Sequence, residues 1–189
     1  MPYAIVRTEP KHEGWCSLLL ATLRKPDGGE IRRELEDHGA AVAVLPYDPE
    51  RRVAMMVRQF RTPVLFVSGG QDLLECPAGL LDSDDPVADA RREAEEEVGL
   101  HLAELEPVST VWSMPGISTE RMHLFLAPYS ASDVRGEGGG LATEHEDITK
   151  LELPLGELAA MADDGRLDDM KTLLLVQTLR LRRPDLFLG

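Results

Sequence analysis

Residues 79–100 read GLLDSDDPVADARREAEEEVGL and predict a helix behind a short loop. Asp84 or Asp85 before Pro86 is a suitable helix start, because an aspartate side chain accepts hydrogen bonds from free backbone N–H groups and proline is tolerated in the first turn. Gly99 is the expected stop, since glycine readily adopts the left-handed conformation that ends many helices. The narrow apolar stripe of this helix consists of Val87, Ala90, Ala94 and Val98.

The charges on the predicted helix have two interpretations. Residues 89–100 contain five carboxylates and two arginines. A solvated charged face is the ordinary interpretation, because Glu–Arg pairs stabilise a helix by only about 0.2–0.5 kcal/mol. Glu93, Glu96 and Glu97, however, stand at i, i+3 and i+4 and repel one another from one face. A cation that prefers oxygen ligands, such as Mg²⁺, would relieve this repulsion, so a metal site is the alternative.

Composition limits the classes of protein to which the chain can belong. Its 189 residues fit one catalytic-sized domain with an appended element. A formal net charge of −14 disfavours nucleic acid or an anionic membrane as partner, because proteins bind those with clustered Lys and Arg. An anionic small-molecule ligand would need a cation or a few placed arginines. The apolar run 172-TLLLV-176 is far too short to span a bilayer.

The N-terminus and the two cysteines indicate the compartment. The start, MPYAIVRTEPKHEGW, lacks the basic and apolar regions of a secretory signal, so we expect a cytoplasmic protein. Cys16 and Cys76 lie far apart and have no CxxC spacing, which argues against a disulfide framework and a zinc site. Both are expected to be small buried hydrophobic residues.

The remaining patterns predict strands and helices in layers. Residues 16–24 and 30–37 flank the turn PDGG and predict an N-terminal hairpin. Further predicted strands are 40–47, 52–60, 106–114 and 121–129, and further predicted helices are 155–165 and 168–182. This order favours an α+β, or mixed α/β, sandwich. We predict a β extension over residues 1–38 and a main domain over 39–189.

The acidic stretch resembles the Nudix box. Its second half is matched by Arg92-Glu93, Ala94, Glu96-Glu97, Gly99 and Leu100. A glycine, an arginine and three glutamates in register are rare in an unrelated helix, so the resemblance favours the metal site over the solvated face. The loop after Gly79 is one residue shorter than the usual pattern, and Asp84 is the nearest match to the acidic residue expected there.

The resemblance covers most of the chain. The segments 58-RQFR-61, 75-ECPAGLLD-82, 115-PGISTERMHLFLA-127, 138-GGGLATEHEDI-148 and 171-KTLLL-175 look like the nucleoside-diphosphate-sugar branch of the Nudix family. The shortened box, the Glu-Cys before Pro77 and the triple glycine look most like GDP-mannose pyrophosphatases, whereas STERMHLF is shared with ADP-ribose pyrophosphatases. The resemblance implies an α/β/α Nudix sandwich with an N-terminal antiparallel sheet that commonly builds a homodimer.

The resemblance also implies a set of metal ligands. Glu93 and Glu97 would coordinate Mg²⁺, with Mn²⁺ able to substitute, and Glu96 would assist directly or through water. The backbone carbonyl of Ala78 would complete the site, and Arg92 would orient the glutamates. Glu146 would ligate metal or accept the proton of the attacking water, with Glu144 as the second candidate. His145 between them is expected to be an ordinary loop residue, since Mg²⁺ sites do not need imidazole.

Six residues are implied on the substrate side: Arg61, Trp15, Arg33, Glu34, Glu120 and Lys171. The guanidinium of Arg61 suits the diphosphate, because it binds phosphate through two parallel hydrogen bonds. Lys171 would approach from the last helix, with a solvated helix-start lysine as the alternative. Trp15 would stack on the nucleotide base, with core packing as the alternative. Arg33 and Glu34 would reach the base, and Glu120 would reach the sugar.

Three functions therefore compete. The first is Mg²⁺-dependent hydrolysis of GDP-mannose to GMP and mannose 1-phosphate. The second is the same chemistry on ADP-ribose, giving AMP and ribose 5-phosphate. The third is a non-catalytic nucleotide-sugar sensor, since a fold does not determine a function. The retained Glu93, Glu96 and Glu97 argue against the sensor, and the lack of a basic stripe argues against a messenger-RNA substrate.

Overall fold

The computed structural model describes residues 1–70, 72–140 and 148–188 and has the predicted α+β composition. The chain divides into two compact units. The first unit comprises Met1–Ala41 and Thr110–Met122, and the second comprises Val42–Ser109 and His123–Gly189. The boundary at residue 38 remains a prediction.

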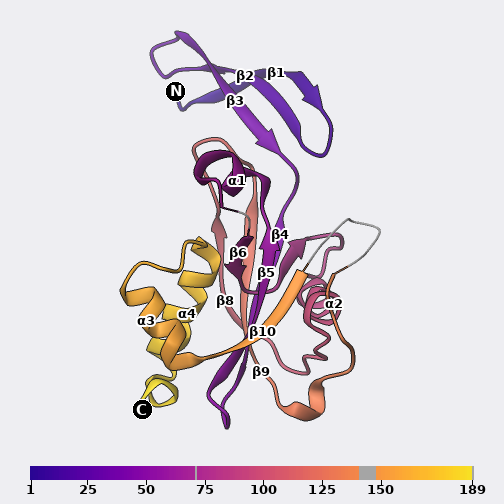
Figure 1. Ribbon diagram of the computed structural model, residues 1–189. Helices are drawn as coiled ribbons and strands as arrows, with labels where there is room; N and C mark the ends of the chain where they lie inside the picture. The colour runs from indigo at the N-terminus through magenta and orange to yellow at the C-terminus, as the bar shows by residue number, and fades with distance from the viewer. Residues whose placement is uncertain (71, 141–147, 189) are drawn as a thin grey trace. The chain divides into compact units, whose positions relative to one another are not determined.

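The first unit contains a three-stranded antiparallel sheet of β1 (Ala4–Glu13), β2 (Ser17–Arg24) and β3 (Glu30–Asp37) (Figure 1). Strands β2 and β3 form the predicted N-terminal hairpin. Strand β1 was not predicted, because its sequence AIVRTEPKHE mixes charges and a proline without clear alternation. The backbone of Glu36 donates to the carbonyl of Ile117 and accepts from the N–H of Thr119, both at 2.9 Å. These bonds join β3 to the turn that precedes β9.

A seven-stranded sheet forms the centre of the second unit. Its strands are β4 (Ala41–Asp48), β5 (Val53–Phe60), β6 (Asp72–Glu75), β7 (Ala78–Leu80), β8 (Glu106–Trp112), β9 (Arg121–Pro128) and β10 (Ile148–Pro154). The main order is β10-β5-β4-β9-β8, with β6 paired to β5 and β7 paired to β4. Every residue of β4, AVAVLPYD, is buried, as expected for a central strand with apolar side chains on both faces.

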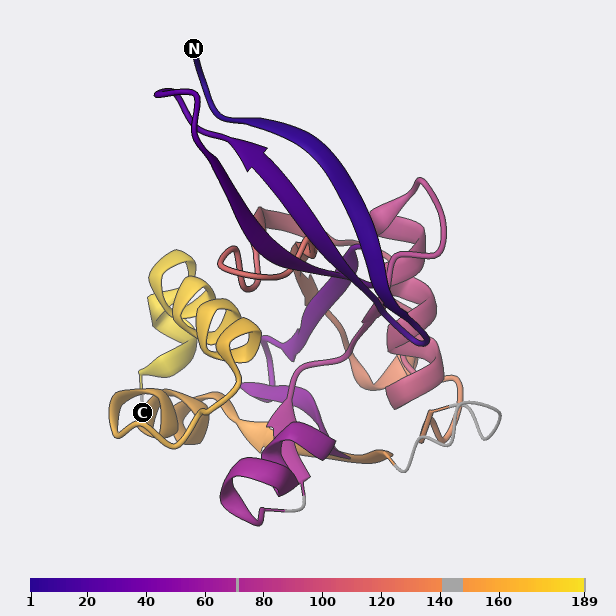
Figure 2. The same ribbon diagram turned by 90° about the horizontal axis from the view of Figure 1, so that it is seen from above.

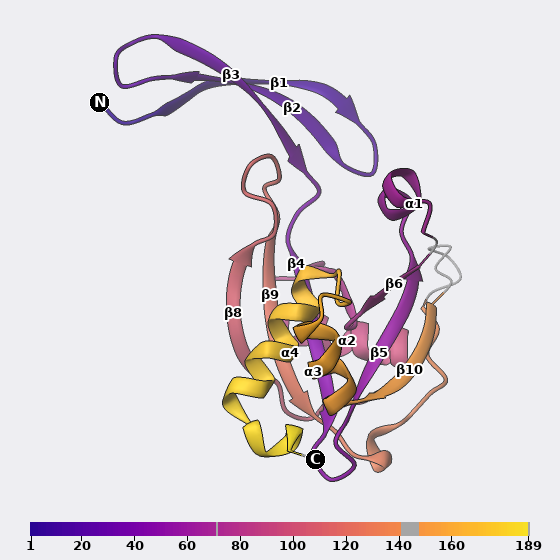
Figure 3. The ribbon, with the colours of Figure 1, turned by 60° about the vertical axis from the view of Figure 1, so that its left-hand side comes forward.

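Helices cover both faces of this sheet. The helices of this unit are α1 (Thr62–Ser68), which buries none of its residues, α2 (Pro86–Val98), α3 (Leu155–Asp163) and α4 (Met170–Arg182), with short 3-10 turns at Ala131–Asp133 and Pro184–Phe187. Helix α2 lies on one face, and α3 and α4 lie on the other (Figures 1, 2 and 3). The layers match the predicted sandwich. Among the described residues, no helix has the length and apolarity needed to cross a membrane.

The apolar stripe of α2 attaches this helix to the sheet. Ala90, Ala94 and Val98 are fully buried in one core cluster with β4 and β5, and Val87 packs against its edge. Small side chains at these positions let α2 approach the sheet closely. The rest of the helix, including its glutamates, is therefore held at a defined distance from the strands. Of the cysteines, Cys76 is buried as predicted, whereas Cys16 is only half-buried.

Candidate active site

The ends of α2 are capped as the sequence predicts. The Asp85 side chain accepts hydrogen bonds from the N–H groups of Val87 at 3.0 Å and Ala88 at 3.2 Å. Gly99 ends the helix in the left-handed conformation, with φ of 70°. Asp84, the nearest match to the acidic residue of the shortened box, is exposed and precedes the cap. The caps thus fix which residues of α2 face the sheet.

Two glutamates of α2 are buried beside strand β7. Glu97 is 2% exposed and Glu93 is 9% exposed, whereas Glu96 is half-buried. The Glu97 Oε2 atom accepts a hydrogen bond from the Ala78 N–H at 3.1 Å. Burying a carboxylate is costly unless it is hydrogen-bonded or paired with a cation. This site therefore concentrates negative charge where Ala78 meets α2.

The absence of a side chain at Gly79 makes room for Glu93. A Cβ atom at Gly79 would lie 2.1 Å from the carboxyl carbon of Glu93, far inside van der Waals contact. Strand β7 and the Glu93 carboxylate can therefore approach one another only because residue 79 is glycine. The close approach places the Glu93 carboxylate against the backbone of β7, and carboxylate oxygens are ligands that hard divalent cations prefer.

Arg92 relieves part of the repulsion among the glutamates. Its guanidinium lies 2.8 Å from a Glu93 oxygen, 2.9 Å from a Glu96 oxygen and 2.8 Å from an Asp82 oxygen. Burial alone would lower the pKa of Arg92, but these carboxylates outweigh it and raise the pKa above its usual range. Arg92 thus stays charged and contacts the two glutamates that the resemblance expects it to orient.

The described residues supply only part of a metal site. In residues 1–70, 72–140 and 148–188, no group of three or more His, Cys, Asp or Glu side chains is arranged to hold a metal ion. Glu144, His145 and Glu146 lie outside the described residues. The triple glycine before them is bound to the end of α2: Gly139 N–H donates to the Glu97 carbonyl at 2.8 Å and Gly140 N–H to the Glu96 carbonyl at 3.1 Å. Gly139 and Gly140 thus lie against the C-terminal end of α2.

Arg61 and Lys171 share one buried carboxylate. Arg61 pairs side-on with Glu75, Nε to Oε1 at 2.7 Å and Nη2 to Oε2 at 2.9 Å. Lys171 donates to the same Oε2 atom and, at 3.0 Å, to Asp169. Burial would raise the pKa of Glu75, which is 2% exposed, but the two cations keep it below its usual range. The Lys171 side chain is only 10% exposed, so its interpretation as a solvated helix-start lysine was wrong.

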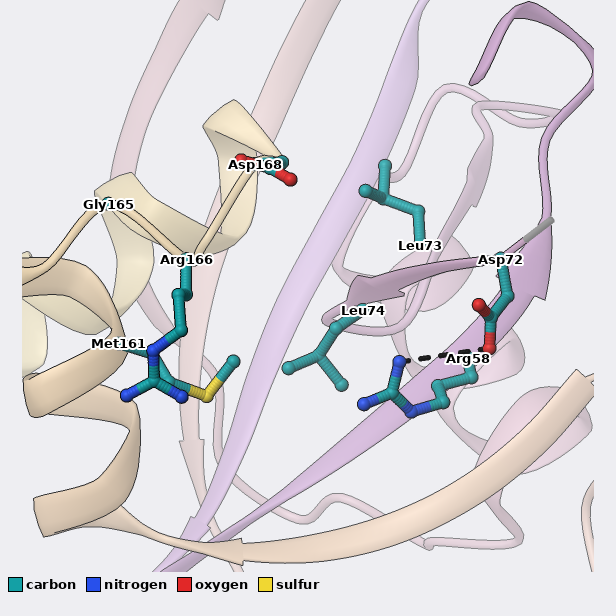
Figure 4. A pocket seen from close by; sticks show the side chains of 8 residues that line it. All are labelled: Arg58, Asp72, Leu73, Leu74, Met161, Gly165, Arg166 and Asp168. Atoms are coloured by element: carbon teal, nitrogen blue, oxygen red, sulfur yellow. Dashed lines mark ion pairs between the residues drawn. The ribbon is translucent and has the colours of Figure 1, made fainter. Parts of the chain in front are cut away.

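The other arginine of the RQFR segment lies on the opposite face of the sheet. Val57 packs in the core cluster with α2, and Glu75 pairs directly opposite Val57, so both share that face. Arg58 follows Val57 and points away, since successive strand residues alternate. Arg58 lines a cavity of about 440 Å³ between strands β5 and β6 and the end of α3 with the residues that follow it (Figure 4). There its Nη1 atom lies 3.7 Å from Asp72 Oδ2.

The NUDIX domain family matches residues 37–175, which include this whole arrangement. The chain belongs to the Nudix family. This Nudix hydrolase is 41% identical to the GDP-mannose pyrophosphatase of Cronobacter sakazakii over 164 residues, covering 85% of this chain and 84% of that protein. It is 38% identical to the GDP-mannose pyrophosphatase of Pectobacterium atrosepticum over 187 residues, covering 96% and 95%.

A solved structure supports the fold of the Nudix hydrolase. The crystal structure of an ADP compounds hydrolase superposes with a TM-score of 0.78, covering 98% of this chain and 96% of that one. The two sequences are only 17% identical, so this likeness concerns the fold alone. Nudix hydrolases generally depend on a divalent metal ion, and the carboxylates of α2, with Glu93 placed beside Gly79, have the chemistry to bind such an ion.

The remaining predicted substrate residues of the Nudix hydrolase belong to its first unit. Trp15 is 76% exposed and stacks on His38 with ring centroids 4.9 Å apart, so its interpretation as a core residue was wrong. The Glu120 Oε1 atom lies 3.0 Å from His38 Nε2, within hydrogen-bond distance. Arg33 and Glu34 are exposed on β3. The roles of these residues toward substrate remain predictions.

The sequence patterns did not predict the roles of Glu75 and His38 in the Nudix hydrolase. Glu75 forms ion pairs with both Arg61 and Lys171, and His38 contacts the carboxylates of Glu120 and Glu36. Glu75 stands in the quoted ECPAG segment, but its sequence pattern does not separate a buried acid from an exposed one. His38 has no sequence signal, because its partners Glu36 and Glu120 are separated by 84 positions in the chain.

Proposed function

We propose that the protein is a Mg²⁺-dependent pyrophosphatase that hydrolyses GDP-mannose to GMP and mannose 1-phosphate. The observation that carries this proposal is the 41% identity to a GDP-mannose pyrophosphatase over 85% of the chain. The buried glutamates of α2 and the neighbouring cations support the same chemistry. Hydrolysis of a diphosphate needs its negative charge neutralised and a water molecule aligned for attack on phosphorus.

Carboxylates would bind the metal ion and accept the proton of the attacking water. Glu93, Glu96 and Glu97, with the carbonyl of Ala78 and with Glu146, are the proposed ligands. Bound Mg²⁺ supplies neutralisation of phosphate charge and lowers the pKa of a bound water. The hydrogen bond from Ala78 N–H keeps the Glu97 carboxylate in one orientation. Glu146, or Glu144 in its place, would accept the proton of the attacking water.

Six side chains are proposed to bind the substrate. Arg61 and Lys171 carry the positive charge proposed to bind the diphosphate. Trp15 has an exposed indole face suited to stacking on guanine. Arg33 and Glu34 would contact the base, and Glu120 would accept a hydrogen bond from the sugar.

Product analysis on two substrates tests the substrate assignment. The protein would be incubated with Mg²⁺ and either GDP-mannose or ADP-ribose, and the phosphate-containing products separated and kcat/KM compared. Higher catalytic efficiency on GDP-mannose, with GMP and mannose 1-phosphate as products, is expected. Higher efficiency on ADP-ribose would replace the proposed substrate. Binding of GDP-mannose without turnover of either compound would favour the sensor.

Two charge-neutralising variants test the assigned ligands. Glu97→Gln should lower kcat by about 100-fold or more, because loss of even a residue behind a metal ligand costs 10–100-fold. Glu95→Gln is the matched control, since Glu95 is exposed on the same helix and should keep full activity. Treatment with EDTA should abolish activity, and added Mg²⁺ or Mn²⁺ should restore it. Equal activity of both variants would contradict the assignment.

We also propose a cytoplasmic homodimer built by the N-terminal sheet. The exposed apolar side chains in and directly before β1 support the assembly, among them Tyr3, Ile5 and Val6, at 60%, 62% and 41% exposure. Sedimentation equilibrium of the full chain should give twice the monomer mass of 20.9 kDa. Ile5→Asp should shift the measured mass toward that of a single chain. A monomer at all concentrations would contradict the assembly.

A further inference from the structure

Two cations meet at a single oxygen atom of Glu75. Arg61 Nη2 lies 2.9 Å from Glu75 Oε2, and Lys171 Nζ donates to the same oxygen. The two positive groups would repel each other at this separation without a negative charge between them. Glu75 is therefore what keeps the arginine and the lysine side by side.

The ion pair between Glu75 and Arg61 is buried at Glu75 and exposed at Arg61. Glu75 is 2% exposed, whereas the Arg61 side chain is 40% exposed. The side-on pair uses one N–H of Nε and one of Nη2, which are two of the five donors of a guanidinium. The other three belong to the edge that points away from Glu75. That edge has the fork geometry that binds a phosphate through two parallel hydrogen bonds.

Lys171 is fixed from a second direction. Asp169, the N-cap of α4, accepts from Lys171 Nζ at 3.0 Å and from the Thr172 N–H at 2.9 Å. Thr172 Oγ1 in turn accepts from the Cys76 N–H at 2.7 Å, directly after Glu75. The start of α4 and the end of β6 are thus joined at the point where the two cations meet. Both side chains are therefore already ordered before an anion binds.

We propose that Glu75 is a positioning residue that aligns Arg61 and Lys171 as one binding group for the substrate's diphosphate. The inference rests on the proposed function, because it takes a diphosphate as the ligand of these cations. A free arginine or lysine loses side-chain entropy on binding, and holding both in advance removes that cost. Glu75 itself lies behind the cations and does not touch the substrate.

A double-mutant cycle tests whether Glu75 acts through Arg61. Glu75→Gln keeps the shape but removes the charge, so the two cations separate and kcat/KM on GDP-mannose should fall by about 10- to 100-fold. In an Arg61→Ala background the same substitution should lower kcat/KM by a clearly smaller factor, because only Lys171 is then left for Glu75 to position and non-additivity marks residues that act together. Equal losses in both backgrounds, or no loss in either, would overturn the proposal.

A second variant covers the case in which Glu75→Gln does not fold. Glu75→Asp keeps the charge balance of the cluster but shortens the side chain by one methylene, so it should fold and still misplace Arg61. Its loss of kcat/KM should again be clearly smaller in the Arg61→Ala background. Arg58→Gln is the matched control, because Arg58 belongs to the same RQFR segment but points to the opposite face and should leave kcat/KM unchanged.

Binding of GDP separates this inference from the proposed function. The dissociation constant of GDP with Mg²⁺, measured by titration calorimetry, should rise by a similar factor in Glu75→Gln and stay unchanged in Arg58→Gln. If the wild type hydrolyses neither substrate, the proposed function has failed, and the same cycle on GDP affinity decides the role of Glu75. No detectable GDP binding by the wild type would overturn the positioning role.

Discussion

The Glu93 carboxylate occupies the space that a side chain at residue 79 would take. A Cβ atom there would lie 2.1 Å from both the carboxyl carbon and one oxygen of Glu93. The glycine of the box is therefore needed for contact with its own glutamate, 14 positions later in the chain. A local feature of one strand thus decides where a buried charge of α2 is placed.

Gly79→Ala should lower activity much more than stability. The colliding atoms are the end of a flexible side chain, so the fold can adapt while the carboxylate moves by an ångström or more. Displacements of about 1 Å cost roughly 100-fold in rate, and kcat/KM should fall by about that factor. Kinetics and thermal unfolding of the same preparation would measure both effects.

Gly156→Ala is the control for this prediction. Gly156 lies in α3, and an added Cβ there meets nothing within 4 Å. Activity should be unchanged, and stability should rise by up to about 1 kcal/mol, because alanine favours a helix over glycine. Full activity of Gly79→Ala would show that the close approach to Glu93 is not required.

Gly138→Ala should destabilise the protein more than Gly165→Ala. Both glycines have positive φ, 66° and 76°, which costs another residue roughly 1–2 kcal/mol. A Cβ at Gly138 would also lie 2.5 Å from the Glu97 carbonyl oxygen, whereas one at Gly165 meets nothing within 4 Å. Backbone cannot yield as a side chain can, so Gly138→Ala should lose at least about 1 kcal/mol more. Urea unfolding of the two variants measures the difference, and equal losses would contradict it.

His38 should make stability depend on pH. Burial alone would lower its pKa, but Glu120 and Glu36 outweigh burial and raise the pKa above 6.5. A group with a raised pKa in the folded state stabilises fully below its unfolded pKa and loses that contribution as pH rises through the folded pKa. The protonated histidine should contribute about 1.5–3 kcal/mol, as hydrogen bonds to charged groups do.

A comparison with His38→Gln isolates this contribution. The free energy of unfolding would be measured in urea from pH 6 to pH 9 for both proteins. The wild-type advantage should be largest near pH 6 and should shrink as pH increases. An advantage that stays constant over this range would mean that folding does not raise the pKa of His38.

The two cysteines should differ in reactivity. Burial raises the pKa of Cys76 to about 12, so its thiolate is almost absent at pH 8. Cys16 is only half-buried. A thiol reagent at pH 8 should therefore modify one cysteine in the native protein and two in urea, and peptide mapping should identify Cys16 as the native site. Modification of Cys76 under native conditions would contradict its burial.

Much of the fold was predictable because its signals are local. The caps of α2 at Asp85 and Gly99 depend on neighbouring backbone groups, and its alanine stripe depends on helical periodicity alone. Helix α1 was missed, because its seven residues TPVLFVS are short, apolar and partly β-branched. Such a segment carries no spacing that separates a helix turn from a loop.

The sequence by itself determined the family, the acidic helix with its start and end, and the face from which Glu93, Glu96 and Glu97 project. These features follow from residue types at fixed spacing along one element. Only the tertiary structure decided that Glu75 pairs with Arg61 and Lys171. The same holds for His38, which contacts both Glu36 and Glu120. Both arrangements join residues up to 96 positions apart, and burial decides which partner each charge needs. Which charges meet inside a fold depends on how its elements pack, and no local pattern encodes that packing.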